Sequence, residues 1–320
     1  MKQSYLLLFL ILFLNNIYSQ SLIEIEHFGE NPGNLKMFIH NNIIKDSIKP
    51  PLVIVLHGCS QNAKNVSELT GWNKLADLNN FVVLYPQQKI LNNPSLCFNW
   101  FRNNDIEKNK GECESIYEMI AFAKKQYNID SNRIYITGLS AGGFMSVAMI
   151  ATHPELFQSA AIFAGGAYKI ATNPFDAIQA MSSKDDVDQK KLINNIKEQN
   201  PNFTGPFPIL LIYQGLNDKI VNPKNALSLV NQWAGINNID SIPDKTEYFY
   251  LGINDITRMT YNDSLGKPKI FLYEVANLGH QLMIKPGDKD DEGGSMRNFA
   301  VNKGYHSTYQ TAKEFGILLK

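Results

Sequence analysis

Between residues 51 and 213, short apolar runs alternate with longer amphipathic segments of helical period. Unbroken apolar runs of this length are typical of strands buried on both faces. We predict strands at 51–56, 81–85, 133–137, 160–164 and 208–213, and helices at 67–78, 114–127, 141–152 and 189–198. Strand and helix in repeated alternation predict an α/β fold, with a mostly parallel sheet and helices on both faces.

The flanking sequence extends this pattern. Residues 22–40 predict one or two opening strands, and we expect a helix at 223–234, strands near 247–251 and 270–275, and a last helix at 307–319. Two long segments, 86–111 and 279–305, interrupt the alternation and follow predicted strands, so both should lie at the same edge of the sheet. The sequence contains no internal repeat and no convincing linker, which predicts a single catalytic domain over residues 20–320.

The first residues resemble an export signal. Lys2 precedes an apolar run at 5–14 and small or polar residues near Ser19, and the run is shorter than the roughly 20 residues that cross a bilayer. We therefore predict a signal peptide at 1–19 and secretion to the periplasm or the medium, with no membrane association after cleavage.

Charge and cysteine content limit the kinds of ligand and partner that the chain can bind. Lys plus Arg and Asp plus Glu both number 30, so no net field attracts nucleic acid or an anionic surface. We expect a small or neutral ligand and a monomer. In an oxidising compartment Cys59, Cys97 and Cys113 allow one disulfide with one thiol left over, and their spacing matches no zinc site, so we expect no bound metal.

The segment Gly138-Leu139-Ser140-Ala141-Gly142 lies between a predicted strand and an amphipathic helix. This is the context of the nucleophile elbow of the α/β-hydrolase fold, in which a serine on a tight turn projects from the sheet. A helix-capping serine is the alternative. We predict that Ser140 is a nucleophile.

A nucleophilic serine needs a base and a carboxylate, which follow it in the order Asp, His in this fold. Asp218 and His280 each come directly after a predicted strand, and they have this order. A solvated turn is the alternative role for Asp218, while Asp176 and Asp263 lack the strand-end context. Among the histidines the rival of His280 is His306, at the start of the last helix.

The oxyanion of an acyl-transfer intermediate is normally held by two backbone N–H groups. We predict Ala141 and Cys59 as the donors, the second because it lies in the loop after the strand at 51–56. We expect His57 to brace this loop by hydrogen bonds without taking a proton from the substrate. In the long segment, Trp100 and Phe101 are candidates for substrate contact, with core packing as the alternative.

Several segments together resemble the polyhydroxybutyrate depolymerase family of esterases, which includes the feruloyl and acetylxylan esterases of carbohydrate esterase family 1. They are His57-Gly58-Cys59-Ser60-Gln61, Gly71-Trp72-Asn73, Leu84-Tyr85-Pro86-Gln87, Cys97-Phe98-Asn99-Trp100-Phe101, the elbow with its flanking residues, and Gly279-His280. The resemblance implies secretion, no cofactor, an acyl-enzyme mechanism, and a disulfide between Cys59 and Cys97. Where many members carry a Gly-His-Ala-Trp-like stretch, this chain has Gly279-His280-Gln281-Leu282.

We therefore predict a secreted serine carboxylic-ester hydrolase acting on feruloyl or acetyl esters of plant polysaccharide. The alternatives are hydrolysis of poly(3-hydroxybutyrate) or its oligomers, a peptidase of the same fold, and a binding protein that kept the fold without activity.

Overall fold

The computed structural model describes residues 22–43, 49–182 and 187–319. The predicted signal peptide at 1–19 lies outside these residues. Within the described ranges, no helix combines the length and the apolar character that a membrane crossing requires.

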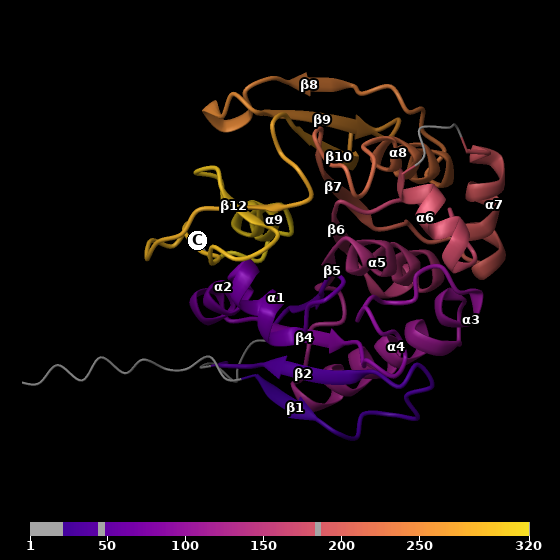
Figure 1. Ribbon diagram of the computed structural model, residues 1–320, viewed down its shortest axis with the longest axis vertical. Coiled ribbons are helices and arrows are strands. Elements are labelled where there is room, and N and C mark those ends of the chain that lie inside the picture. Colours follow the sequence, from indigo (N-terminus) through magenta and orange to yellow (C-terminus); the bar gives the residue numbers. More distant parts are fainter. Residues whose placement is uncertain (1–21, 44–48, 183–186, 320) are drawn as a thin grey trace, which may run out of the picture.

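A ten-stranded sheet runs through the molecule in the order β1-β2-β4-β3-β5-β6-β7-β10-β9-β8 (Figure 1). The strands, in that order, are Ile23–Ile25, Lys36–His40, Val82–Gln87, Leu52–Leu56, Ile134–Leu139, Ser159–Phe163, Ile209–Gly215, Pro268–Val275, Ile256–Asn262 and Lys245–Glu247. Neighbours from β4 through β10 pair in parallel, and antiparallel strands flank them at both edges. The mostly parallel sheet confirms the predicted fold class.

Helices cover both faces of this sheet. One face carries α1 (Ala63–Thr70), α2 (Trp72–Asn79) and α9 (Ser307–Glu314), which lie together on one side of the strands in Figure 1. The opposite face carries α3 (Asn103–Ile106), α4 (Gly111–Gln126), α5 (Ala141–Thr152), α6 (Pro174–Ser182), α7 (Gln189–Gln199) and α8 (Lys224–Ile236), and short 3₁₀ turns occupy Pro154–Leu156 and Tyr250–Gly252.

The packing of β3 explains why its sequence is apolar without interruption. Successive side chains of a strand point to opposite faces. Leu52 and Ile54 pack in the core under α4 and α5, whereas Val53 and Val55 pack in the core under α1, α2 and α9. All are fully buried, so neither face tolerates a polar residue.

Most predicted elements are present with ends within a few residues of the prediction, and α5 has the predicted bounds. The helix predicted at 67–78 is instead two helices, because Gly71 has φ 76° and ends α1 in a left-handed turn. The last helix ends at Glu314, five residues before the predicted end at 319.

The prediction near 247–251 was wrong, and β9 was missed. The strand β8 ends at Glu247, and the chain then turns through Phe249 and Leu251, which both have positive φ. Their apolar side chains imitate a strand pattern but are exposed to solvent. The β9 strand mixes polar and apolar residues, so its sequence gives a weak signal.

The two long segments follow β4 and β10, which are parallel neighbours of the central strands. The first contains α3, and the second contains two short parallel strands, β11 (Leu282–Ile284) and β12 (Ala300–Asn302), which were not predicted. Both segments leave the carboxyl ends of their strands, and this edge of the sheet holds the candidate active site.

Candidate active site

Ser140 lies at the sharp turn between β5 and α5. Its backbone has φ 57° and ψ −122°, a conformation that side-chain-bearing residues rarely adopt. The turn is held by the Ser140 N–H, which donates to the carbonyl of Phe163 at 2.8 Å. A Cβ at Gly142 would lie 2.4 Å from the Leu56 carbonyl oxygen, and one at Gly138 would lie 2.3 Å from the Gly142 backbone. Both glycines are therefore required by close packing at the elbow.

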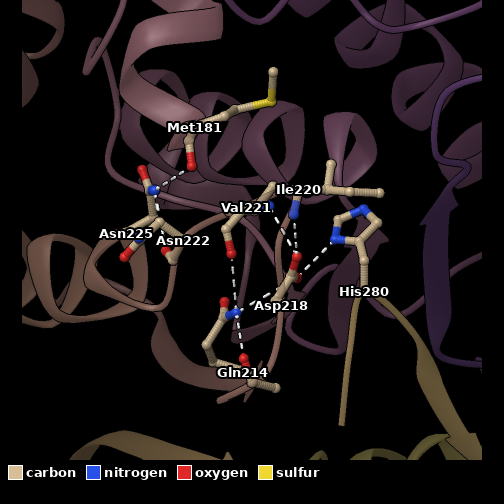
Figure 2. A network of polar contacts seen from close by, with 9 residues as sticks. Met181, Gln214, Asp218, Ile220, Val221, Asn222, Asn225 and His280 are labelled. Atoms are coloured by element: carbon tan, nitrogen blue, oxygen red, sulfur yellow. Dashed lines mark hydrogen bonds and ion pairs between the residues drawn. The ribbon is translucent and has the colours of Figure 1, made fainter. Parts of the chain in front are cut away.

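Asp218 and His280 form a buried pair (Figure 2). Nδ1 of His280 lies 2.7 Å from Oδ2 of Asp218, and the carboxylate is fully shielded from solvent. The other carboxylate oxygen, Oδ1, accepts from the N–H groups of Ile220 at 2.8 Å and Val221 at 2.9 Å. An ionised carboxylate only accepts, so Nδ1 carries the proton of this hydrogen bond. The second ring nitrogen, Nε2, points away from Asp218 in Figure 2.

The sheet brings the three predicted residues to one edge. Ser140 follows β5, Asp218 follows β7 and His280 follows β10, and these strands are parallel members of the order β5-β6-β7-β10. Ser140 and His280 are 8% and 9% exposed. Both belong to the described residues, and no hydrogen bond joins the Ser140 hydroxyl to the imidazole in this conformation.

His306 has a different environment. Its Nε2 lies 3.0 Å from the Thr70 carbonyl at the end of α1, so this nitrogen is the donor. Burial lowers the pKa of His306 to about 4. Within the described residues no carboxylate side chain hydrogen-bonds to its imidazole, which is the arrangement of a structural histidine.

The loop after β3 lies against the elbow. A Cβ on Gly58 would be 3.7 Å from the Cβ of Ser140, and the Gly58 N–H donates to Oε1 of Gln61 at 2.8 Å. The N–H groups of Cys59 and Ala141 donate to no group within the described residues, so both remain available to a bound oxyanion.

His57 holds this loop in place. Its Nε2 accepts from the Gln88 N–H at 3.1 Å, so Nδ1 is the protonated nitrogen and donates to the Gly58 carbonyl at 2.8 Å. Burial lowers the pKa of His57 to about 4, which keeps the imidazole neutral. These bonds agree with a bracing role.

A buried polar network that was not predicted from the sequence lies behind the loop. Glu112, in the first turn of α4, accepts from Nε2 of Gln88 at 2.5 Å, and it accepts from the backbone and the side chain of Asn99 at 2.8 and 2.7 Å. Burial raises the pKa of Glu112 to about 8, and nearby Asp105 adds to the shift. A glutamate in a helix of mixed pattern normally faces solvent, so no local signal marks it. Gln88 directly follows Leu84–Gln87, a segment that resembles the family, and this position is the one signal in the sequence that points toward the network.

The cysteines pair as the resemblance to the esterase family implied. Cys59 and Cys97 form a disulfide, and Cys113 is a buried free thiol whose pKa is raised by burial. The disulfide links the loop after β3 to the long segment after β4.

The two aromatic candidates lie mainly in the core. Trp100 is 5% exposed and stacks on Phe144 with ring centroids 4.0 Å apart, and Phe101 packs edge-on against Trp100. This placement is that of packing residues, and their contact with substrate stays a prediction.

Residues 45–246 match the family described as Esterase PHB depolymerase. The chain belongs to this family. Poly(3-hydroxyalkanoate) depolymerase C of Paucimonas lemoignei is 35% identical over 298 residues, which is 93% of this chain and 70% of that protein. Feruloyl esterase B of Neurospora crassa is 27% identical over 287 residues, covering 83% of this chain and 91% of its own length.

An esterase of solved structure has the same fold. The acetyl xylan esterase from Aspergillus awamori superposes with a TM-score of 0.74 at 23% sequence identity, covering 81% of this chain and 94% of that one. The likeness confirms the predicted α/β-hydrolase fold. The chain is a serine ester hydrolase, as predicted.

The candidate site brings three kinds of group to one edge of the sheet. It offers one hydroxyl on a strained turn, one imidazole oriented by a buried carboxylate, and two unoccupied backbone donors. In the described part of the chain, no group of three or more His, Cys, Asp or Glu side chains is arranged to hold a metal ion.

Proposed function

We propose that Ser140 is the nucleophile of this esterase, His280 the general base and Asp218 the residue that orients the imidazole. The observation that carries the proposal is the 2.7 Å contact between Asp218 and Nδ1 of His280, which leaves Nε2 as the proton acceptor. Two backbone N–H groups occupy the remaining oxygen of Asp218, so the carboxylate cannot turn away from the histidine.

The reaction then has two halves. Nε2 of His280 takes the hydroxyl proton as Oγ of Ser140 attacks the ester carbonyl, and the N–H groups of Cys59 and Ala141 receive the negative charge on oxygen. The alcohol leaves with the proton from Nε2, which yields an acyl-serine. Water then attacks the acyl-serine while losing a proton to Nε2. The acid is released as Nε2 returns that proton to Oγ of Ser140, which restores the free enzyme.

For the substrate, we propose feruloyl or acetyl esters carried on plant polysaccharide. The support is the activity of two similar proteins, a feruloyl esterase in sequence and an acetyl xylan esterase in structure. Hydrolysis of poly(3-hydroxyalkanoate) is the second candidate, because the 35% identical relative is a depolymerase of that polymer.

We also propose that the chain is secreted. The support is the charge and apolar pattern of the first residues together with the Cys59–Cys97 disulfide, a bond that persists in oxidising compartments.

The test is a panel of methyl ferulate, acetylated xylan and hydroxybutyrate oligomers, run with wild type and Ser140→Ala. We expect the variant to remain folded and to lose activity by roughly 10⁴-fold or more on whichever esters wild type hydrolyses. Retained activity in the pure, folded variant would refute the role of Ser140, and an inactive wild type would indicate a binding protein. Clearing of polyester with the other esters untouched would reverse the order of the substrates.

A further inference from the structure

A cavity of about 470 Å³ lies beside the candidate active site. Ser60, Gln61, Asn65 and Leu69, from the loop after β3 and from α1, form one wall, and Arg297, Asn298 and Phe299, just before β12, form the other. These walls come from distant parts of the chain that lie side by side, as α1 and the segment around β12 do in Figure 1.

The cavity adjoins both halves of the catalytic machinery. The ring of Phe299 stands edge-on to the imidazole of His280, with centroids 6.1 Å apart. On the opposite wall, Gln61 accepts the N–H of Gly58, the residue before the proposed oxyanion donor. When an ester is cleaved, the base returns its proton to the departing alcohol oxygen. The alcohol must therefore lie against the imidazole, and Phe299 lines one side of that ring.

The walls are fixed in advance of binding. Arg297 pairs with the Glu68 carboxylate, and the hydroxyl of Ser295 donates to the Glu68 carbonyl at 2.9 Å, which ties this segment to α1. The Leu282 N–H donates to the Phe299 carbonyl at 2.8 Å. Phe299 is held at φ 72°, an unfavourable backbone conformation for an aromatic residue. A conformation of this kind persists where the surrounding contacts hold it in place.

The lining chemistry suits hydroxyl groups on a small ring. Gln61 is 5% exposed, its Oε1 is engaged, and its amide nitrogen bonds to no described group. The side-chain amides of Asn65 and Asn298 likewise form no hydrogen bond within the described residues, so all three can serve a ligand. Among the described residues that line the cavity there is no carboxylate, and the one cation among them, Arg297, is already paired.

Amide groups both donate and accept, as sugar hydroxyls do, and the flat ring of Phe299 matches the apolar face of a sugar ring. A polyhydroxyalkanoate chain offers acceptors and methyl groups but no donors, so it would leave amide oxygens unpaired. We infer that this cavity is a subsite for the alcohol portion of the substrate, namely the sugar ring that bears the esterified hydroxyl. The inference rests on the proposed function of Ser140 and His280 and specifies the substrate class of that site.

The test compares esters that share an acyl group and differ in the alcohol. Ethyl acetate and a mono-acetylated methyl xyloside are hydrolysed by wild type, Asn65→Leu and Phe299→Leu, with Asn132→Leu as the matched control. Asn132 is an exposed residue just before β5, at the opposite edge of the sheet. We expect each cavity variant to lower kcat/KM for the xyloside ester roughly tenfold and to lower the value for ethyl acetate clearly less, since ethanol is smaller than a sugar ring and reaches fewer of the lining residues. Asn132→Leu should change neither.

An unchanged ratio of the two substrates in both cavity variants would overturn the subsite while leaving the proposed function intact. Loss of both activities to the same extent in folded variants would also overturn it. If wild type hydrolyses neither ester, the proposed function itself fails. Faster cleavage of hydroxybutyrate oligomers than of the sugar ester, with the same dependence on Asn65, would replace the sugar by a polyester chain.

A second measurement uses inhibition by the free sugar. Unesterified methyl xyloside should inhibit ethyl acetate hydrolysis by wild type competitively, since it occupies the cavity beside His280. Inhibition should weaken roughly tenfold in Asn65→Leu. Complete absence of inhibition in wild type would overturn the assignment.

Discussion

Removal of the Cys59–Cys97 disulfide should destabilise the protein chiefly through its unfolded state. The two residues are 38 apart in sequence, and closing a loop of that length restricts the unfolded chain by about 13 cal/mol/K, or about 3.9 kcal/mol at 25 °C. The folded loop has other ties, because the Ser60 N–H donates to the Ser95 carbonyl at 2.8 Å and Nε2 of Gln88 donates to the Cys97 carbonyl at 3.1 Å. The native fold should therefore survive the loss of the bond.

The experiment is urea unfolding of wild type and of the Cys59→Ser, Cys97→Ser double variant, followed by tryptophan fluorescence. We expect the free energy of unfolding to fall by about 3 to 4 kcal/mol, a large part of the 5–15 kcal/mol typical of a domain. The dependence on urea should steepen, since the unlinked chain expands further when it unfolds. Cys113→Ala is the control, and its unfolding should respond to reductant as wild type does. A loss below about 1 kcal/mol, or a Cys97–Cys113 link in unreduced peptide maps, would refute the reasoning.

Four further substitutions test individual side chains. His280→Ala should lose esterase activity by roughly 10⁴-fold or more while His306→Ala keeps nearly all of it, and kinetics showing the reverse would move the base to His306. Because burial raises the pKa of Glu112 from 4.5 to about 8, the unfolded chain releases this proton first as pH rises. Between pH 4.5 and 8, the free energy of unfolding of wild type should therefore fall, relative to that of Glu112→Gln, by up to roughly 1.4 kcal/mol per pH unit. Urea titrations at several pH values measure this difference, and parallel pH profiles for the two proteins would contradict it. Trp100→Ala should cost roughly 3–5 kcal/mol of stability through lost stacking on Phe144, and a raised KM at unchanged stability would instead support substrate contact.

Much of the fold could be predicted from local pattern. Parallel strands buried on both faces leave unbroken apolar runs such as 52–56, and the amphipathic period that follows each run identifies its helix. The elbow at Ser140 is also a local signal, because its glycines are required by contacts within one turn and with the neighbouring strand. Edge strands lack this signature, which is why β9 was missed and the exposed apolar turn at 248–252 was taken for a strand.

The site was predictable only as far as strand ends reveal it. Asp218 and His280 could be predicted because each follows a strand and because they occur in the expected order along the chain. Their 2.7 Å contact, across 62 residues of sequence, results from the order of the strands in the sheet. Burial is likewise a property of the whole fold. Glu112 looks like a solvated helix residue in sequence, yet the packing of α4 against the loop after β4 removes it from water and raises its pKa.

The wall that Phe299 forms has no signal in the sequence at all. Its carbonyl accepts the Leu282 N–H, and its ring lies beside the imidazole of His280, next to the paired strands β11 and β12. Sequence periodicity and turn chemistry thus determined the sheet, the elbow and the chemical identity of the reacting groups. The tertiary structure decided which of those groups meet, which are withdrawn from water, and where a substrate can lie, because these depend on contacts between segments far apart in the chain.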